Sequence, residues 1–356
     1  MNIDLGYNAF FELNRKRLHW DEFSVARVIA EHRGSYKVRN ATGTYAAKIT
    51  GKQMFNASSR EDYPAVGDWV AITELDAKRA VIYGVLPRRT IIKRKYSGKN
   101  ETQVIAANID VAFIVESVGR DYNLNRFERY FVIAHAGGVQ PIIVLNKIDL
   151  ISREDLDSKR IQLKDRFGDA EVISTSIVSD GGLDELRAHL LSGKTYCFLG
   201  SSGVGKSSLI NALLGGGDIK TGEISSGAGR GKHVTTNREM YFLHDGSIVI
   251  DNPGMREVGM ADADAGVDVS FDQILMLARK CKYVDCAHVH EHGCAVLSAL
   301  NAGTLDKGKY ANYLSLKKEA EHYEMTELEQ KEKDRAFGKF VKRAKKELKE
   351  YGHKDY

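Results

Sequence analysis

The chain has 356 residues, enough for two or three domains. With 43% hydrophobic and 28% charged residues and a net charge of +4, its composition is that of a soluble globular protein. No apolar run approaches the length of a membrane-spanning helix, and residues 1–16 lack the cationic start and apolar core of a signal peptide. The sequence therefore argues against membrane and secreted proteins, and we expect a cytoplasmic protein with no membrane partner.

The first segment, residues 1–20, is a short N-terminal extension. We expect a short amphipathic helix that docks on a surface that the sequence does not identify, and a loose tail is the alternative. The apolar residues that suggest a helix are Leu5, Phe10, Phe11, Leu13 and Leu18.

Residues 21–95 change to short alternating segments separated by turn residues. About five such strands without a long helical pattern predict a small β-barrel. An OB-fold fits best because it closes with five strands, although an SH3-like barrel fits the pattern nearly as well. OB-folds often present basic and aromatic residues to RNA, and ordinary solvated strand faces are the alternative. The candidate RNA-binding residues are Arg27, Arg33, Tyr36, Lys37, Arg39 and Tyr45.

The segment from Arg88 to Lys99 carries six basic residues in twelve and no acid. Because it follows a predicted nucleic-acid-binding barrel, we expect it to contact a phosphate backbone. A plain exposed linker is the alternative.

Residues 96–260 show strands alternating with helices, which predicts a parallel sheet covered on both faces. Ligands bind such sheets at the carboxyl ends of the strands. One predicted strand, 141–145, ends in Asn146-Lys147-Ile148-Asp149, which fits the N-K-x-D pattern. A carboxylate at Asp149 would accept from guanine N1–H and the exocyclic amine, which adenine does not offer. After the next strand, Ser174-Thr175-Ser176 resembles a loop that donates a backbone N–H to guanine O6.

A phosphate-binding loop follows the apolar strand 196–199 and opens a helix. Its glycines let backbone N–H groups turn toward phosphate oxygens, and the helix N-terminus adds a partial positive charge. Lys206 would reach the β- and γ-phosphates, and the Ser207 hydroxyl would ligate Mg²⁺. A glycine-rich turn without a ligand is the alternative. The residues of this site are Gly200, Ser201, Ser202, Gly203, Val204, Gly205, Lys206, Ser207 and Ser208.

Two further segments fit the switch regions of a GTPase. The glycine-rich stretch 225–236 is the expected switch I, in which Thr235 or Thr236 would complete the Mg²⁺ shell. Asp251-Asn252-Pro253-Gly254 fits D-x-P-G, so Asp251 would hold Mg²⁺ through water and the Gly254 N–H would touch the γ-phosphate. A simple Asx-type turn is the alternative for this second segment.

The order of these motifs is permuted, because the N-K-x-D and serine loops precede the phosphate loop. The old chain ends would be joined between Leu183 and Tyr196. From Arg27 to Ala295 the chain resembles the RsgA/YjeQ (YloQ) family of circularly permuted GTPases, which act in assembly of the small ribosomal subunit. The stretch 231–236 resembles the family's G-R-H-T-T-T, departing at Lys232 and Val234.

A cysteine cluster follows the α/β region, with the spacing Cys281-x₄-Cys286-x-His288-x₅-Cys294. Three thiolates and one imidazole fit one structural Zn²⁺ site, whereas buried free cysteines or a disulfide are the alternatives. The residues alone leave His288, His290 and His292 open as the fourth ligand. The resemblance favours His288, because the family shows the same spacing. Cys197, in the strand before the phosphate loop, is expected to be a core residue.

Hydrolysis is expected to be slow in the isolated protein. Met255 stands where many GTPases place a water-orienting glutamine. His233 is the best substitute, and the resemblance implies this role, whereas packing or RNA contact is the alternative. The candidate catalytic residues are His233, Lys206, Thr235, Thr236 and Gly254.

The C-terminal segment 331–356 has ten basic and five acidic residues. A solvated helix is one interpretation and a helix that contacts rRNA is the other.

The predicted architecture is multidomain: an extension (1–20), an OB-fold β-barrel (21–95), a circularly permuted α/β P-loop GTPase domain (96–260) and an α-helical zinc-binding domain (261–356). The resemblance implies a protein that binds the small ribosomal subunit and its rRNA and hydrolyses GTP there, and we expect a monomer. An ATP-dependent P-loop enzyme and a GTP-regulated RNA-binding switch that does not act on ribosomes are the competing hypotheses.

Overall fold

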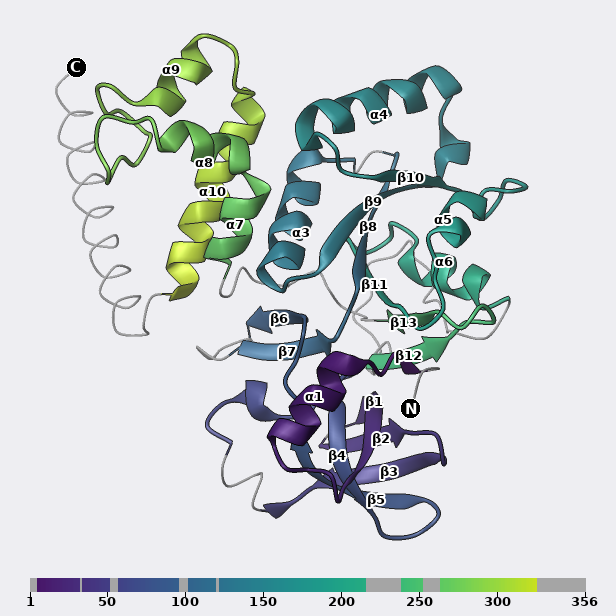
Figure 1. Cartoon of the computed structure of the whole chain (residues 1–356). Coiled ribbons are helices and arrows are strands. Elements are labelled where there is room, and N and C mark those ends of the chain that lie inside the picture. The colour runs from purple at the N-terminus through teal and green to yellow at the C-terminus, as the bar shows by residue number, and fades with distance from the viewer. Residues whose placement is uncertain are drawn as a thin grey trace, which may run out of the picture.

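The computed structural model describes residues 5–32, 34–51, 57–95, 102–119, 122–215, 238–251 and 263–324. In this part of the chain, no helix is long and apolar enough to cross a membrane. Figure 1 shows a barrel at the N-terminal end, a sheet covered by helices in the middle, and a group of helices at the C-terminal end.

The N-terminal barrel is closed by five strands in the order β1-β2-β3-β5-β4, with β4 pairing back onto β1. The pair β3–β5 is parallel and the other pairs are antiparallel. This arrangement confirms the predicted OB-fold class. The strands are β1 (Ser24–His32), β2 (Ser35–Arg39), β3 (Thr44–Ile49), β4 (Trp69–Glu74) and β5 (Arg79–Val85).

The barrel core corrects two of the candidate RNA-binding residues, Tyr36 and Tyr45. In β2, Tyr36 and Val38 point inward while Lys37 and Arg39 stay exposed, as strand alternation requires. Tyr45 is buried on β3 in the same core. Tyr36 and Tyr45 therefore fill the barrel and do not face RNA. Arg33 lies outside the described residues.

Arg27 is also buried, with 1% of its surface exposed, so its assignment to an RNA-binding face was wrong as well. Its guanidinium donates to the carbonyls of Leu5, Gly67 and Asn108 and to the Thr195 hydroxyl. Burial lowers the pKa of Arg27 to about 10. This side chain connects the extension, the barrel and the α/β sheet, because its partners come from all three.

The extension forms helix α1 (Ala9–Arg17), which begins after Asn8, whose side chain accepts from the Phe10 N–H at 3.0 Å. Phe11 is buried against Trp69 of the barrel, with ring centroids 5.8 Å apart. The helix therefore docks on the barrel, as one of the two sequence interpretations expected.

The basic segment after the barrel makes intramolecular pairs. Arg88 donates to both carboxylate oxygens of the buried Asp68 at 2.8 Å, and Lys93 pairs with Glu61 at 2.8 Å. Arg89 pairs with Asp110. The expected phosphate contact is therefore wrong for Arg88, which is held inside the fold. The segment leads into a hairpin of β6 (Ile91–Lys95) and β7 (Thr102–Ala107), within which the predicted boundary at 95/96 falls.

The central sheet has the strand order β10-β9-β8-β11-β13-β12, with the first five strands parallel and β12 antiparallel. Its helices cover both faces: the core cluster with Phe127 of α3 lies on one face and the cluster with Leu209 of α6 lies on the other. The elements are β8 (Val111–Ser117), α3 (Leu124–Ala136), β9 (Gln140–Asn146), η3 (Ile148–Leu150), α4 (Arg153–Phe167), β10 (Val172–Thr175), α5 (Asp184–Ala188), β11 (Thr195–Leu199), α6 (Lys206–Leu213), β12 (Arg238–Phe242) and β13 (Ile248–Asp251).

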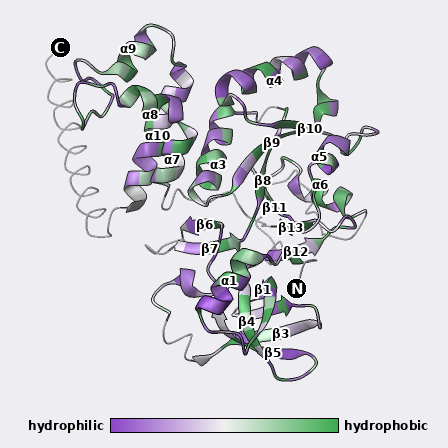
Figure 2. Cartoon of the chain, viewed as in Figure 1, coloured by the Kyte–Doolittle hydropathy of each residue, from purple (hydrophilic) through white to green (hydrophobic). Residues whose placement is uncertain are grey.

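Hydropathy follows this layering. The inner strands are coloured mostly as hydrophobic in Figure 2, whereas much of α4 is hydrophilic. Six of the seven β8 residues are buried, whereas α4 buries only Leu163 and Arg166. Cys197 of β11 is fully buried, which raises the pKa of its thiol to about 12 and confirms it as a core residue.

The barrel and the central sheet are continuous. Strand β12 pairs with β13 on one side and with β1 of the barrel on the other, so all eleven strands form one sheet. Ala30 lies opposite Glu239 and Glu31 lies opposite Arg238, whose guanidinium pairs with the Glu31 carboxylate at 3.1 Å.

The C-terminal helices pack on α3. A Cβ at Gly266 would lie 2.2 Å from the Val132 carbonyl oxygen, so only glycine allows α7 to approach α3 this closely. On α10, Glu319 accepts from both terminal nitrogens of Arg129 at 2.6 and 2.7 Å. These helices are α7 (Asp264–Ser270), α8 (Asp272–Ala278), α9 (Ala295–Asn301) and α10 (Lys307–Glu324).

Candidate nucleotide-binding site and metal centre

Four candidate segments lie at the carboxyl ends of parallel strands. The N-K-x-D loop follows β9, the serine loop ends β10, the phosphate loop follows β11 and Asp251 ends β13. These strands are parallel and lie in the order β10-β9-β8-β11-β13 in one sheet. Their carboxyl ends therefore lie along the same edge of the sheet. The permuted chain order therefore leads to one continuous site.

The phosphate loop has the backbone that its glycines predict. Gly200, Gly203 and Gly205 have φ values of 148°, 84° and 101°. A Cβ at Gly200 would lie 2.2 Å from the Val115 carbonyl oxygen, and one at Gly205 would lie 2.4 Å from Asn146 Nδ2. Side chains at these positions would force the loop away from its neighbours.

Helix α6 begins at Lys206, directly after this loop. The Lys206 ammonium donates to the carbonyls of Gly200 and Ser201 at 2.7 and 2.6 Å, so it lies across the loop. Ser207 and Ser208 are half-buried in the first turn, where N–H groups lack intrahelical partners. Ser202 is exposed and Val204 is buried. The loop thus presents a cation and helix N–H groups, the chemistry that binds phosphate.

The N-K-x-D loop is tied to the phosphate loop by two hydrogen bonds. Asn146 is 2% exposed, and its Nδ2 donates to the Val204 carbonyl at 2.8 Å. Lys147 adopts the left-handed conformation, with φ of 63°, and its Nζ donates to the Gly203 carbonyl at 2.7 Å. The relative position of the two loops is therefore fixed by direct contact.

The serine loop supports the N-K-x-D loop. The Ser176 hydroxyl donates to Asp149 Oδ1 at 2.6 Å, and the Thr175 hydroxyl donates to Asn146 Oδ1 at 3.0 Å. Asp149 itself is exposed at the rim, whereas Ile148 packs partly against the core. An exposed carboxylate with a fixed position can accept two parallel N–H donors from a base.

Two residues that the sequence analysis did not single out hold Ser174 of the serine loop. Arg160 of α4 donates from Nε and Nη2 to the Ser174 hydroxyl at 3.1 and 2.8 Å. Glu185 of α5 accepts from the Ser174 N–H at 2.9 Å. Both residues lie on helices with many exposed charges, so nothing in their local pattern distinguishes them.

Asp251, the expected Mg²⁺ residue of the D-x-P-G segment, ends β13 beside the phosphate loop. Burial raises the pKa of Asp251, and the positive charge of Lys206 opposes this shift. The Ser207 hydroxyl, in the first turn of α6 after β11, and the Asp251 carboxylate, at the end of the neighbouring strand β13, are hard oxygen donors of the kind that suits Mg²⁺. The remaining expected residues, His233, Thr235, Thr236 and Gly254, lie outside the described residues.

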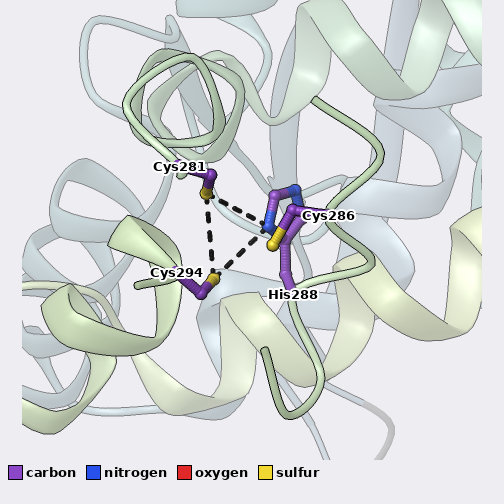
Figure 3. A group of neighbouring side chains, drawn as sticks. All are labelled: Cys281, Cys286, His288 and Cys294. Atoms are coloured by element: carbon purple, nitrogen blue, oxygen red, sulfur yellow. Dashed lines mark hydrogen bonds between the residues drawn. The ribbon is translucent and has the colours of Figure 1, made fainter. Parts of the chain in front are cut away.

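The cysteine cluster forms a candidate metal centre. One ligand atom from each of its four residues lies within 4.8 Å of every other. Figure 3 shows the three sulfurs and the His288 ring converging. The Sγ atoms of Cys281 and Cys294 are 3.8 Å apart, and they lie 3.6 and 3.5 Å from His288 Nδ1. Tetrahedral Zn–S and Zn–N bonds of about 2.3 and 2.0 Å imply separations of about 3.5 to 3.8 Å. The cluster, Cys281, Cys286, His288 and Cys294, could therefore hold zinc.

The loop that carries these ligands is braced by residues that the sequence did not single out. The Glu291 carboxylate accepts from the N–H groups of Ala287, Val289 and His290 at 2.8 to 3.0 Å. Tyr310 of α10 donates its hydroxyl to the His288 carbonyl at 2.6 Å. His290 and His292 are exposed and stand outside the cluster, which leaves His288 as the imidazole of the candidate site.

A phosphate loop joined to an N-K-x-D loop on a sheet of permuted chain order defines the class of circularly permuted P-loop GTPases. The sequence model of the family described as "RsgA GTPase" matches residues 85–261. A small ribosomal subunit biogenesis GTPase RsgA 2 from Lactiplantibacillus plantarum is 38% identical and covers 93% of each chain. A small ribosomal subunit biogenesis GTPase RsgA 1 from Bacteroides thetaiotaomicron is 37% identical and covers 92% of each chain. The chain belongs to the RsgA family of GTPases, whose members are GTP hydrolases.

Solved structures agree with this assignment. The crystal structure of YjeQ from Thermotoga maritima superposes with a TM-score of 0.61 at 25% identity, covering 82% of this chain and 96% of that one. YloQ, a circularly permuted GTPase, has the same fold, with a TM-score of 0.59 at 24% identity over 86% of this chain and 98% of that one.

Proposed function

We propose that this protein binds GTP at the joined loops, hydrolyses it with Mg²⁺, and acts on the small ribosomal subunit during its late maturation. The observation that carries the nucleotide part is the pair of hydrogen bonds from Asn146 and Lys147 to the phosphate loop. These bonds hold the loop of Asp149 and the phosphate loop in one fixed arrangement, which supports the binding of a guanine nucleotide across the two loops.

The residues divide the work as follows. Lys206 and the α6 N-terminus hold the phosphates, Asp149 reads the guanine, and Ser174, Thr175 and Ser176 support the base-reading loop. Ser207 and Asp251 would hold Mg²⁺, together with Thr235 or Thr236. When bound, Mg²⁺ neutralises charge that develops on the phosphate oxygens. Gly254 would sense the γ-phosphate and His233 would orient the attacking water, because Met255 cannot.

The partner proposal rests on the relatives, which are named small ribosomal subunit biogenesis GTPases. Exposed Lys37 and Arg39 on β2 and Lys48 on β3 supply positive charge for rRNA on the barrel. The cysteine cluster would hold one structural Zn²⁺ in the C-terminal domain. We propose that the protein works as a monomer in the cytoplasm, where these subunits mature, with domains at 21–95, 96–260 and 261–356.

Steady-state hydrolysis of GTP and ATP, measured with and without purified small ribosomal subunits, tests this proposal. We expect slow GTP hydrolysis that the subunits accelerate at least tenfold, and no such response with ATP. Lys206→Ala should abolish GTP hydrolysis, because the phosphates then lose the cation that holds them. Lys164→Ala, an exposed lysine on α4, is the matched control and should behave as wild type.

Two outcomes would contradict the proposal in different ways. Comparable turnover of ATP would favour a P-loop enzyme of another specificity. GTP hydrolysis that does not respond to subunits would keep the GTPase and favour an RNA-binding switch that acts elsewhere.

A further inference from the structure

A carboxylate is buried directly behind the phosphate loop. Glu116 lies near the end of β8, and its surface is 0% exposed. On this strand Ala112 and Ile114 belong to the core cluster that includes α3, whereas Phe113 and Val115 belong to the cluster on the other face. Strand alternation therefore places Glu116 on the α3 face of the sheet.

The Glu116 carboxylate contacts the first variable residue of the phosphate loop. The Ser201 hydroxyl donates to Glu116 Oε1 at 3.4 Å, and Arg126 of α3 approaches Glu116 Oε2 at 3.9 Å. Tyr130, one turn further along α3, is buried, which raises its pKa, and the Ser201 side chain opposes this shift. Ser201 is thus held by β8 and lies near α3.

Burying a carboxylate costs free energy of folding. If packing were the only role of this position, an apolar side chain like that of Ile114 would stabilise the fold more. What the carboxylate adds is a fixed position for Ser201. The Ser201 carbonyl accepts from Lys206 Nζ at 2.6 Å, so moving this residue would move both the loop and its lysine.

We propose that Glu116, supported by Arg126, is a positioning residue for the phosphate loop. It holds Ser201 and thereby preorganises the cradle and Lys206 before phosphate binds. This inference rests on the proposed function, in which nucleotide binds at this loop. Helix α3 also contacts the C-terminal helices, through the ion pair between Arg129 and Glu319 of α10. Helix α3 therefore connects Glu116, behind the phosphate loop, with the domain that carries the cysteine cluster.

A double-mutant cycle on nucleotide affinity tests the inference in the full-length protein. We expect Glu116→Ala and Ser201→Ala each to raise the dissociation constants of GDP and GTP about 3- to 10-fold, the effect of one lost hydrogen bond. The double variant should lose no more than the larger single effect, because both changes remove the same contact. Glu116→Gln keeps an acceptor oxygen and should restore affinity to within about 2-fold of wild type.

The kinetic signature separates positioning from general damage. We expect Glu116→Ala to raise KM for GTP while kcat at saturating GTP stays within about 2-fold, because ground-state and transition-state binding are weakened alike. If Glu116→Ala fails to fold, the cycle between Glu116→Leu and Ser201→Ala carries the test, because leucine removes the carboxylate and keeps most of the side-chain volume. In that cycle too, the two effects should not multiply.

Effects that multiply in the cycle, or unchanged affinity in Glu116→Ala, would overturn the inference while the proposed function stands. Lys206→Ala serves as the reference, because it must abolish binding if nucleotide occupies this loop. A wild-type chain that binds neither GTP nor GDP would overturn the proposed function and this inference together.

Discussion

Asp149 is the residue at which the proposed site distinguishes bases. Its carboxylate is held by the Ser176 hydroxyl at 2.6 Å and offers only acceptors. Guanine presents two N–H donors to such a group, whereas a base with a carbonyl at the same position presents an acceptor. Base selectivity therefore depends on hydrogen-bond polarity at one side chain.

Asp149→Asn should reverse this polarity. We expect its GTP affinity to fall about 10- to 100-fold, since a donor then faces a donor. Xanthosine triphosphate, which carries a carbonyl in place of the exocyclic amine, should gain affinity. Competition against labelled GDP measures both effects. Asp157→Asn, an exposed carboxylate on α4, is the matched control, and equal loss for both triphosphates would argue against base reading by Asp149.

Residue-level prediction from sequence worked where a motif fixes both residue type and spacing. The three glycines of the phosphate loop have positive φ values, which suits the turn expected of them, and the four residues of the predicted metal site converge. It failed at Arg27, because its partner Thr195 is 168 positions away and no local pattern reports such a contact. It also failed at Tyr36, whose place beside Val38 on the apolar side of β2 outweighs its aromatic character.

At the level of elements, α3 connects most parts of the molecule. One side faces Glu116 and Ser201 behind the phosphate loop, and another meets α7 and α10. The sequence predicted the alternation of strands and helices in this region and the strand at 141–145 that follows α3, because these patterns are local. It did not predict the partners of α3 on α7 and α10, because these depend on packing between segments more than a hundred residues apart.

The α3–α7 contact contains a titratable group. His135 Nδ1 lies 2.9 Å from the Ser270 hydroxyl, and burial lowers the pKa of His135. The unfolded chain then takes up a proton at higher pH than the folded one. Stability that is present above the ordinary histidine pKa of about 6.5 is therefore lost as pH falls through the window below it.

His135→Asn should weaken this acid sensitivity, because the amide keeps a polar group near Ser270 without a titration. We expect the fall in Tm between pH 7 and pH 5.5 to be smaller than in wild type. Thermal unfolding at both pH values measures it. His244→Asn, an exposed histidine, is the control, and an equal fall in Tm in wild type and His135→Asn would contradict the assignment.

At the level of the whole molecule, the candidate metal centre contacts α10, the helix that also packs on α3. Tyr310 of α10 donates to the His288 carbonyl, and the same helix carries Glu319, the partner of Arg129. Ligand geometry at the cluster and helix packing on the GTPase domain are therefore linked through one element. Structural zinc sites contribute directly to folding free energy.

Protein purified without chelator should contain about one zinc per chain, measured by elemental analysis. Strong chelation or Cys286→Ser should remove it and lower the Tm of the C-terminal helices. His290→Ala, whose exposed ring stands outside the cluster, is the control and should keep both zinc and Tm. Zinc content well below one per chain in fresh wild-type protein would count against the site.

The pairing of β12 with β1 has a consequence for how this chain can be divided. Without the barrel, β12 would be the outer strand of the central sheet, with unpaired backbone N–H and C=O groups along one side. Bare strand edges are templates for pairing with another chain. The barrel therefore also acts as an edge protector, and a GTPase domain cut free of it is expected to self-associate through β12.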